Sequence, residues 1–429
     1  MMKCRSLFLC CLIVNSVLHA ASPTEMREWQ TSSGHKAEAS ALQVEDGTVH
    51  LKMGNGKLVK LAMDKLVESD QKFLQKHFAI PDATEPAAGS DAKPAEGLAY
   101  PLGQMQGPVD AGGGASYFVY LPKSLKQDRP APLIFFCAPW GAKKPGFIKG
   151  MTDVADRFGW VVALSVNSSN AHSMKKNSDF CKKSLDHLFG TLPLDEKRVH
   201  YAGHSGGGAQ SYVNASFRPA YGVMPSAGYV LYGVKPRAEV VYAIGGGYDF
   251  NRYTTANAVA GFKKNGFHRI SPKGHPRAAN SYREDGVFWM ACRYLGEQKS
   301  EHLEEAKDFE RAALIWLKEL QESHSMRAYS NAVVFREYYQ PEGHNGRALE
   351  LLIKELEKTP DNKLYHEALH ALDEFSDKYL AGSVVGSAMN RVDPKVARGT
   401  EKLRESYGHI PEIAAILDAL NKKTDSLKK

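Results

Sequence analysis

The distribution of apolar positions divides the chain into regions of different character. Between about residues 97 and 295, short and nearly continuous apolar runs alternate with stretches of helical spacing. The clearest runs are Tyr117–Leu121, Leu133–Cys137, Trp160–Ser165 and Val240–Ile244. Such runs are typical of strands buried on both faces of a parallel sheet. Residues 148–158 and 179–189 have the spacing of helices between them, so this region is predicted to be an α/β domain.

The region from about residue 26 to residue 78 has the shorter pattern of a half-buried β-sheet. Residues 48–52 and 57–61 alternate apolar and polar side chains, and the turn-forming Gly54-Asn55-Gly56 lies between them. A short helix around Ser69–Phe73 follows, for which Ser69 is predicted to be the N-cap.

Beyond about residue 300 the apolar positions follow helical spacing. The clearest helical pieces are Asp308–Leu320, Gly346–Leu356 and Ile410–Leu420, and none of them carries a motif for chemistry. Residues 81–96 contain alanine, proline and charge without apolar periodicity, which is typical of a linker. We therefore predict a small β domain at 24–78, a linker at 79–96, an α/β domain at 97–296 and a helical region at 297–429.

Composition excludes several classes of function. The formal charge of +7 is spread along 429 residues, with no dense basic stripe interleaved with aromatic residues. A nucleic-acid partner is therefore not expected. No C-x-x-C spacing occurs, and neither a metal nor a cofactor is predicted.

The first residues have the pattern of a secretory signal. Lys3 and Arg5 precede the short apolar run Ser6–Val14, and small residues follow at Ala20-Ala21. The run is too short to span a membrane comfortably, so we predict a signal peptide at 1–21, a secreted or periplasmic protein and no stable membrane span. The rest of the chain keeps Cys137, Cys181 and Cys292, which make no disulfide framework but leave one disulfide among them open.

The strongest motif for chemistry is Gly203-His204-Ser205-Gly206-Gly207. The β-branched and aromatic residues at 198–202 predict a strand before it, and residues 209–215 are compatible with a helix after it. This is the G-x-S-x-G pattern, in which a sharp strand-to-helix turn exposes a serine at the end of a sheet. Ser205 is therefore the candidate nucleophile.

A serine nucleophile needs a base that is oriented by an acid. Asp249 follows the strand-like run that starts at Val240, and His275 follows the short run that starts at Phe267. Both come after Ser205, in the chain order Ser, Asp, His of α/β hydrolases. The stretch Thr254–Lys264 is predicted to be the helix that joins the two strands.

Other residues compete for the same roles. His344 follows a glycine as His275 does, but it lies outside the alternating region, and His204 is expected to pack or to form a local hydrogen bond. Glu284 and Asp285 are alternatives to Asp249 as the acid, although they follow the histidine in the chain.

The combined motifs resemble secreted α/β-hydrolase esterases of the polyhydroxybutyrate-depolymerase-like, acetyl-xylan and feruloyl esterase group. The matching segments are Tyr117–Pro122, Pro132–Ile134, Leu194–Val199, Gly203–Gly207, Asp249-Phe250 and Gly274-His275. The resemblance implies an α/β-hydrolase fold and hydrolysis of small-molecule or glycan esters through an acyl-enzyme, without a cofactor. Peptidase activity on the same triad, or a non-catalytic binding role, stays open.

The loop expected to complete the oxyanion hole departs from that family. Gly206 N–H would be one donor, and relatives usually have a His-Gly-rich motif for the other. This chain has Ala138-Pro139-Trp140-Gly141 instead. Because Pro139 has no N–H, the second donor would be Trp140 or Gly141. Trp140 is equally compatible with packing and with a wall of the substrate site.

The N-terminal block resembles the SLA homology domain. The matching residues are Arg27-Glu28-Trp29, Gly34, Ala37, Ala39, Asp46-Gly47, Leu51, Gly56, Val59–Leu61, Leu66 and Asp70. The resemblance implies an SH3-like barrel that binds a protein or peptide partner. For Trp29 itself, a place in the core of the domain is the simpler interpretation.

Overall fold

The protein was analysed as a computed structural model, which describes residues 26–45, 48–77, 97–275, 279–382 and 393–423. The predicted signal peptide and the predicted linker lie outside these residues. The chain forms two compact units, Met1–Ala88 and Gly89–Lys429. The helical region and the α/β region therefore belong to the same unit.

The first unit is a small antiparallel sheet closed by one helix. Its elements are β1 (Arg27–Gln30), β2 (Lys36–Glu45), β3 (Thr48–Met53), β4 (Leu58–Ala62) and α1 (Glu68–His77), and the strands lie side by side in chain order. Trp29 is buried, and its Nε1 donates a hydrogen bond to Ala39 O. This confirms its place in the core. The predicted N-cap is wrong, because α1 begins at Glu68 and Ser69 lies inside its first turn.

The second unit is built on an eight-stranded sheet. Its strands are β5 (Met105–Asp110), β6 (Ser116–Tyr120), β7 (Ala131–Cys137), β8 (Val161–Ser165), β9 (Leu194–His204), β10 (Ala220–Ser226), β11 (Ala238–Gly246) and β12 (Gly266–Ser271). They lie in the order β12-β11-β10-β9-β7-β8-β6-β5. The six strands from β7 to β12 are parallel, which confirms the predicted α/β-hydrolase fold class.

One of the runs assigned to the parallel sheet has the opposite direction. β6, which contains most of Tyr117–Leu121, pairs antiparallel with both β8 and β5. The apolar run indicates that the strand is buried, but a buried strand can be parallel or antiparallel to its neighbours. The prediction of a parallel strand at this position was therefore wrong.

Helices cover both faces of this sheet. One face is covered by α3 (Met174–Thr191), α4 (Gly206–Phe217) and α5 (Arg252–Ala260), and the other by α2 (Thr152–Phe158) and α6 (Asn280–Glu297). Short 3-10 or π turns occupy Met63–Lys65, Pro145–Phe147, Lys149–Met151, Lys263–Asn265, Phe335–Tyr339 and Ser376–Leu380.

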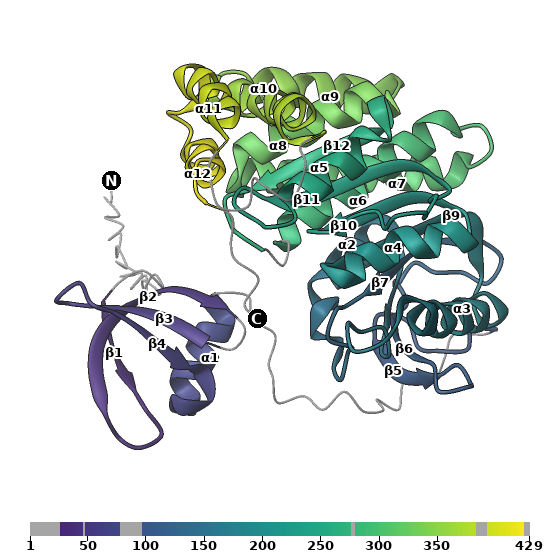
Figure 1. The fold of residues 1–429 in the computed structure, drawn as a ribbon, viewed down its shortest axis with the longest axis horizontal. Helices are drawn as coiled ribbons and strands as arrows, with labels where there is room; N and C mark the ends of the chain where they lie inside the picture. The colour runs from purple at the N-terminus through teal and green to yellow at the C-terminus, as the bar shows by residue number, and fades with distance from the viewer. Residues whose placement is uncertain (1–25, 46–47, 78–96, 276–278, 383–392, 424–429) are drawn as a thin grey trace, which may run out of the picture. The chain divides into compact units, whose positions relative to one another are not determined.

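The C-terminal helices extend these layers. They are α7 (Leu303–Ser323), α8 (Ser325–Val334), α9 (Gly343–Leu356), α10 (Pro360–Phe375), α11 (Pro394–Tyr407) and α12 (Pro411–Leu420). The apolar faces of α7 to α9 share a core with α2 and α6, whereas α10 to α12 pack against α5 and β12. Figure 1 shows α10 to α12 at the β12 end of the sheet, and β5 and β6 at the other end. No helix among the described residues is long and apolar enough to cross a membrane.

Candidate active site

Ser205 lies in a strained turn between β9 and α4. β9 ends at His204 and α4 begins at Gly206, so the chain reverses at a single residue. Ser205 has φ 54° and ψ −121°, and its N–H donates to Ser226 O at 2.8 Å. A positive φ at a residue with a Cβ costs on the order of 1–3 kcal/mol and persists only where the surroundings enforce it. The side chain of Ser205 is partly exposed.

The glycines of the motif allow this turn to pack closely on the sheet. A Cβ at Gly207 would overlap the carbonyl oxygen of Cys137 at the end of β7. A Cβ at Gly203 would overlap the carbonyl of Gly207. Any larger residue at these two positions would push α4 away from β7 and β9. Glycine is therefore required at both, because the backbone of the turn lies so close to these strands.

Asp249 and His275 form a hydrogen-bonded pair on the neighbouring strands. Asp249 follows the end of β11 and His275 follows the end of β12. His275 Nδ1 lies 2.9 Å from Asp249 Oδ1, and the Asp249 side chain is fully buried. The N–H of Asn251 also donates to Asp249 Oδ1, at 2.8 Å. Because Nδ1 donates to the carboxylate, Nε2 of the neutral imidazole is left as the proton acceptor.

The pair lies at the same edge of the sheet as the serine. β9, β11 and β12 are parallel, so their carboxyl ends meet at one edge, where open α/β sheets hold their ligands. The ring of His275 lies 4.8 Å from the ring of His204, the residue before Ser205. Phe250 also stacks on the imidazole, with centroids 4.4 Å apart. These contacts fix the ring of His275 beside the turn.

The competing residues lie elsewhere or are engaged. His344 is exposed near the start of α9 and forms no ion pair with a carboxylate among the described residues. Glu284 and Asp285 both accept hydrogen bonds from Arg327, at 2.6 and 2.8 Å. His204 is buried and its ring packs between those of Trp140 and His275.

The loop after β7 lies against the loop after β8. Trp140 pairs with Ser169 in an isolated antiparallel bridge, and Asn170 N–H donates to Pro139 O at 2.7 Å. In a bridge of this type the flanking residues carry the hydrogen bonds, and the N–H groups of the paired residues point away from the partner segment. The N–H of Trp140 is therefore turned away from Ser169.

Asn170 is a neighbour of the turn that the motif analysis does not single out. The G-x-S-x-G pattern leaves the position after the serine open, and this chain has Gly206 there. A Cβ at Gly206 would overlap the Asn170 amide oxygen. That extra glycine was the available signal for a side chain lying close over the turn.

Neither a metal cluster nor a disulfide accompanies the site. In the described part of the chain, no group of three or more His, Cys, Asp or Glu side chains could hold a metal ion. Cys137, Cys181 and Cys292 are buried free thiols, although the Cys137 and Cys181 sulfur atoms lie 3.6 Å apart. Burial raises the pKa of the Cys292 thiol well above its usual value, which makes it an unreactive thiol.

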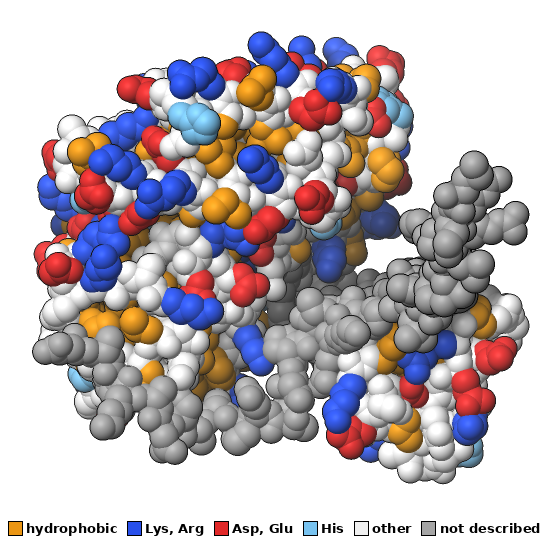
Figure 2. Space-filling view, turned by 180° about the vertical axis from the view of Figure 1, so that it is seen from behind, with side chains coloured by type: hydrophobic (Ala, Val, Ile, Leu, Met, Phe, Trp, Pro, Cys, Tyr) orange, Lys and Arg blue, Asp and Glu red, His pale blue; other side chains and the backbone are white. Residues whose placement is uncertain are grey.

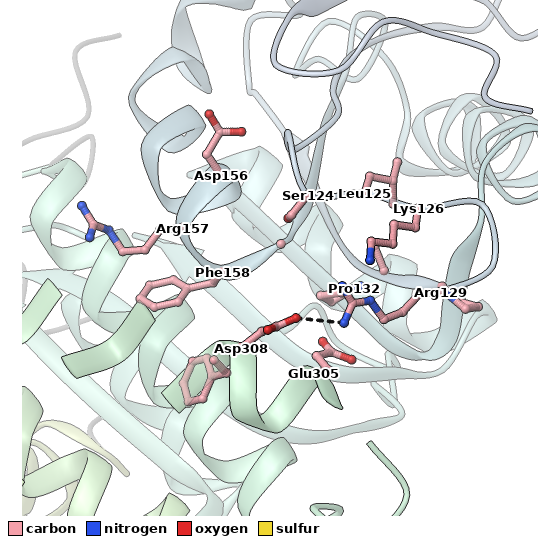
Figure 3. A pocket seen from close by; sticks show the side chains of 14 residues that line it. Ser124, Leu125, Lys126, Arg129, Pro132, Asp156, Arg157, Phe158, Glu305 and Asp308 are labelled. Carbon is pink, nitrogen blue, oxygen red and sulfur yellow. Dashed lines mark hydrogen bonds and ion pairs between the residues drawn. The ribbon is translucent and has the colours of Figure 1, made fainter. Parts of the chain in front are cut away.

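A separate pocket of about 400 Å³ lies at the amino end of β7, away from the serine. Figure 3 shows Lys126, Arg129 and Arg157 together with Asp156, Glu305 and Asp308 around it. Arg129 and Asp308 are ion-paired at 3.0 Å. The pocket is therefore distinct from the carboxyl edge that carries Ser205.

Comparison with known proteins identifies the N-terminal domain. Residues 19–80 match the family described as SLA1 homology domain 1, which confirms the predicted SLA homology domain. A search of curated proteins finds no significant match.

Solved structures similar to this chain include three hydrolases at low identity. The fluorophosphonate-binding serine hydrolase F of Staphylococcus aureus is 14% identical, covering 41% of this chain and 91% of that chain, with a TM-score of 0.34. The acetyl xylan esterase of Aspergillus awamori is 14% identical, covering 37% and 80%, with a TM-score of 0.31. The S-formylglutathione hydrolase of Staphylococcus aureus is 12% identical, covering 41% and 90%, with a TM-score of 0.34.

Proposed function

We propose that this protein is a serine hydrolase that cleaves carboxylic esters. Ser205 is the nucleophile, His275 the general base and acid, and Asp249 the residue that orients the imidazole. One observation carries the proposal: a strained, partly exposed serine shares a sheet edge with a hydrogen-bonded Asp–His pair whose aspartate is buried. Backbone strain at a serine and an oriented imidazole beside it are typical of active sites, and a side-chain network that only stabilises the fold rarely needs both.

The proposed first half-reaction transfers the acyl group to the serine. Ser205 Oγ attacks the ester carbonyl carbon while His275 Nε2 takes the hydroxyl proton. Asp249 accepts the Nδ1–H hydrogen bond and stabilises the imidazolium that forms. When the tetrahedral intermediate collapses, His275 returns the proton to the leaving alcohol.

The proposed oxyanion hole uses two backbone donors. Gly206 N–H follows the nucleophile at the first turn of α4, and the loop after β7 supplies the second donor. The bridge between Trp140 and Ser169 favours Trp140 N–H over Gly141 N–H, because it turns the former away from the neighbouring segment. A lost donor of this kind costs about 10²–10³ in rate.

The second half-reaction releases the acid. A water molecule takes the place of the alcohol and attacks the acyl carbon while His275 Nε2 takes one of its protons. The acyl–Ser205 bond then breaks, His275 returns the proton to Ser205 Oγ, and the carboxylic acid leaves. Each step needs only the three side chains and the oxyanion donors. The partly exposed Ser205 and the aromatic ring of Trp140, which is 47% exposed, are compatible with a small or carbohydrate-linked ester.

The substitution Ser205→Ala tests the proposal. Wild-type protein should hydrolyse short aryl esters and become labelled by a fluorophosphonate probe, and Ser205→Ala should lose both reactions. Ser216→Ala, on the same helix α4, is the control and should keep them. Undiminished ester hydrolysis by Ser205→Ala would refute the assignment. Turnover of peptides alone would favour a peptidase, and an unlabelled wild-type serine would favour a binding protein.

A further inference from the structure

The loops at the carboxyl edge of the sheet are almost free of carboxylates. Residues 138–151, 166–173, 247–251 and 272–275 connect this edge to the following elements, and Asp249 is the only acidic residue among them. Asp249 is buried and paired with His275, so it presents no negative charge to a substrate. The same loops contain Lys143, Lys144, Lys149 and Lys273.

Two further lysines occupy an unfavourable position on α3. Lys175 and Lys176 lie in its first turn, which contains no acidic residue, and both are exposed. Cations at a helix N-terminus oppose the helix dipole and reduce helix stability. Residues that break such a local rule concentrate at functional sites.

The loop after β7, which contains two of these lysines, folds back beside the turn of the nucleophile. Lys143 and Lys144 lie between Trp140 and Phe147, whose rings are 5.6 Å apart. The ring of Trp140 in turn lies 5.9 Å from that of His204, the residue before Ser205. The loop therefore folds back on itself beside the turn.

The start of α3 is tied to the same turn. Asn177 Nδ2 donates to Ser169 O at 2.9 Å, and Asn177 Oδ1 accepts from Ser169 N at 3.1 Å. The next residue, Asn170, lies against Gly206. Lys175 and Lys176 lie in the same first turn of α3 as Asn177, so they belong to the helix that these hydrogen bonds tie to the loop beside Gly206.

Five of these lysines are not ion-paired in the described part of the chain, and Lys and Arg elsewhere on the surface lie among carboxylates. On the face seen in Figure 2, Lys and Arg side chains are interspersed with Asp and Glu side chains. Elsewhere in the described residues, lysines form ion pairs such as Lys123–Asp156 at 3.0 Å and Lys307–Glu304 at 2.8 Å. Within the described ranges, Lys143, Lys144, Lys149, Lys175 and Lys176 form no ion pair with a carboxylate.

We propose that the natural substrate is an anionic ester that carries a carboxylate near the bond to be cleaved. This inference rests on the proposed function and names the substrate class for the same site. Lysines around a concave site raise the local concentration of anions and speed their association, an effect that salt screens. A neutral ester would gain nothing from five cations that no carboxylate neutralises.

The test compares esters that differ only in charge. On the alcohol side, 4-acetoxybenzoate is compared with the neutral 4-acetoxybenzamide. On the acyl side, mono-4-nitrophenyl adipate is compared with 4-nitrophenyl hexanoate. After subtraction of the uncatalysed rates, kcat/KM in low salt should be at least about tenfold higher for the anionic member of one pair. The ratio should fall towards one in 0.5 M NaCl, where the Debye length is only about 4 Å.

Charge-neutral variants locate the effect. The quadruple variant Lys143→Gln, Lys144→Gln, Lys175→Gln, Lys176→Gln should lower kcat/KM for the anionic ester about tenfold. Its kcat/KM for the neutral ester should stay within about twofold of wild type. The control variant Lys318→Gln, Lys354→Gln removes two exposed charges from the tail helices and should change neither value.

The outcomes separate this inference from the proposed function. Equal rates for both members of each pair, or a preference that neither salt nor the quadruple variant reduces, would overturn the anionic substrate while leaving the esterase intact. If no ester is hydrolysed and Ser205 takes no fluorophosphonate label, the proposed function itself fails and the substrate inference falls with it.

Discussion

At the scale of single residues, the proposed function depends on which nitrogen of His275 carries the proton. Nδ1 lies 2.9 Å from Asp249 Oδ1, and this carboxylate oxygen also accepts the Asn251 N–H. Both contacts need an acceptor at Oδ1. In the proposed mechanism, Asp249 therefore keeps the proton on Nδ1 and the lone pair on Nε2.

The substitution Asp249→Asn tests this role without changing the shape of the side chain. An asparagine amide can donate to Nδ1 and so stabilises the tautomer with the proton on Nε2, which cannot act as a base. We expect kcat for a short aryl ester to fall about 10³- to 10⁴-fold, with KM nearly unchanged. Asp179→Asn, an exposed aspartate on α3, should have wild-type kinetics. An Asp249→Asn enzyme with wild-type kcat would remove Asp249 from the mechanism.

At the scale of elements, the turn between β9 and α4 is a packing constraint as much as a catalytic one. The carbonyl of Cys137 at the end of β7 occupies the space that a Cβ on Gly207 would need. Backbone cannot move aside as a flexible side chain can. The first turn of α4, and with it Gly206 N–H, is held in place by this contact.

The substitution Gly207→Ala should therefore displace the start of α4 and disable the site. We expect loss of fluorophosphonate labelling and a free energy of unfolding lower by about 1–3 kcal/mol, as for other overpacked positions. Gly190→Ala is the matched control, because Gly190 is in the helix α3 and nothing lies within 4 Å of an added Cβ. This control should be neutral or stabilising by about 0.5–1 kcal/mol. If both variants behave alike, the close approach of the Cys137 carbonyl is not what requires glycine at position 207.

The same scale shows how much the sequence could reveal. The buried strands and the strand–turn–helix around Ser205 follow from local patterns, because apolar runs and glycines report burial and close approach. The direction of β6 does not follow from its sequence, since parallel and antiparallel strands can be equally buried. The place of Asn170 beside Gly206 depends on the fold of a loop that carries no periodic signal. Motifs thus identify the reacting residues better than their surroundings.

At the scale of the whole molecule, the C-terminal helices are part of the scaffold that holds the proposed pair Asp249 and His275. His268 N–H on β12 donates to Asp373 on α10 at 2.8 Å. Arg252, which lies three residues after Asp249, donates to the carbonyl oxygen of Leu420 at the end of α12, at 3.2 Å. β12 is an edge strand and leads directly to His275, so the helices that cover it also support the imidazole.

The ion pair between β12 and α12 is the point at which this support can be tested. Arg269 is only 2% exposed, and its guanidinium donates to Glu412 Oε1 at 2.8 Å. The hydroxyls of Tyr282 and Tyr365 also donate to this carboxylate. Removing one partner of a buried pair costs about 3–5 kcal/mol, because the other charge stays buried without compensation.

Glu412→Gln should therefore destabilise the second unit by about 2–3 kcal/mol, below the value for a fully buried pair because the Glu412 side chain is 33% exposed. Scanning calorimetry of the full chain should show a lower Tm for this unit, while Glu405→Gln, an exposed glutamate on α11, should leave it unchanged. Adding Arg269→Met to Glu412→Gln should recover part of the loss, because the double variant no longer buries a lone charge. Equal stability of Glu412→Gln and Glu405→Gln would mean that α12 is held to β12 by its apolar contacts alone, and that the helical region supports His275 without this ion pair.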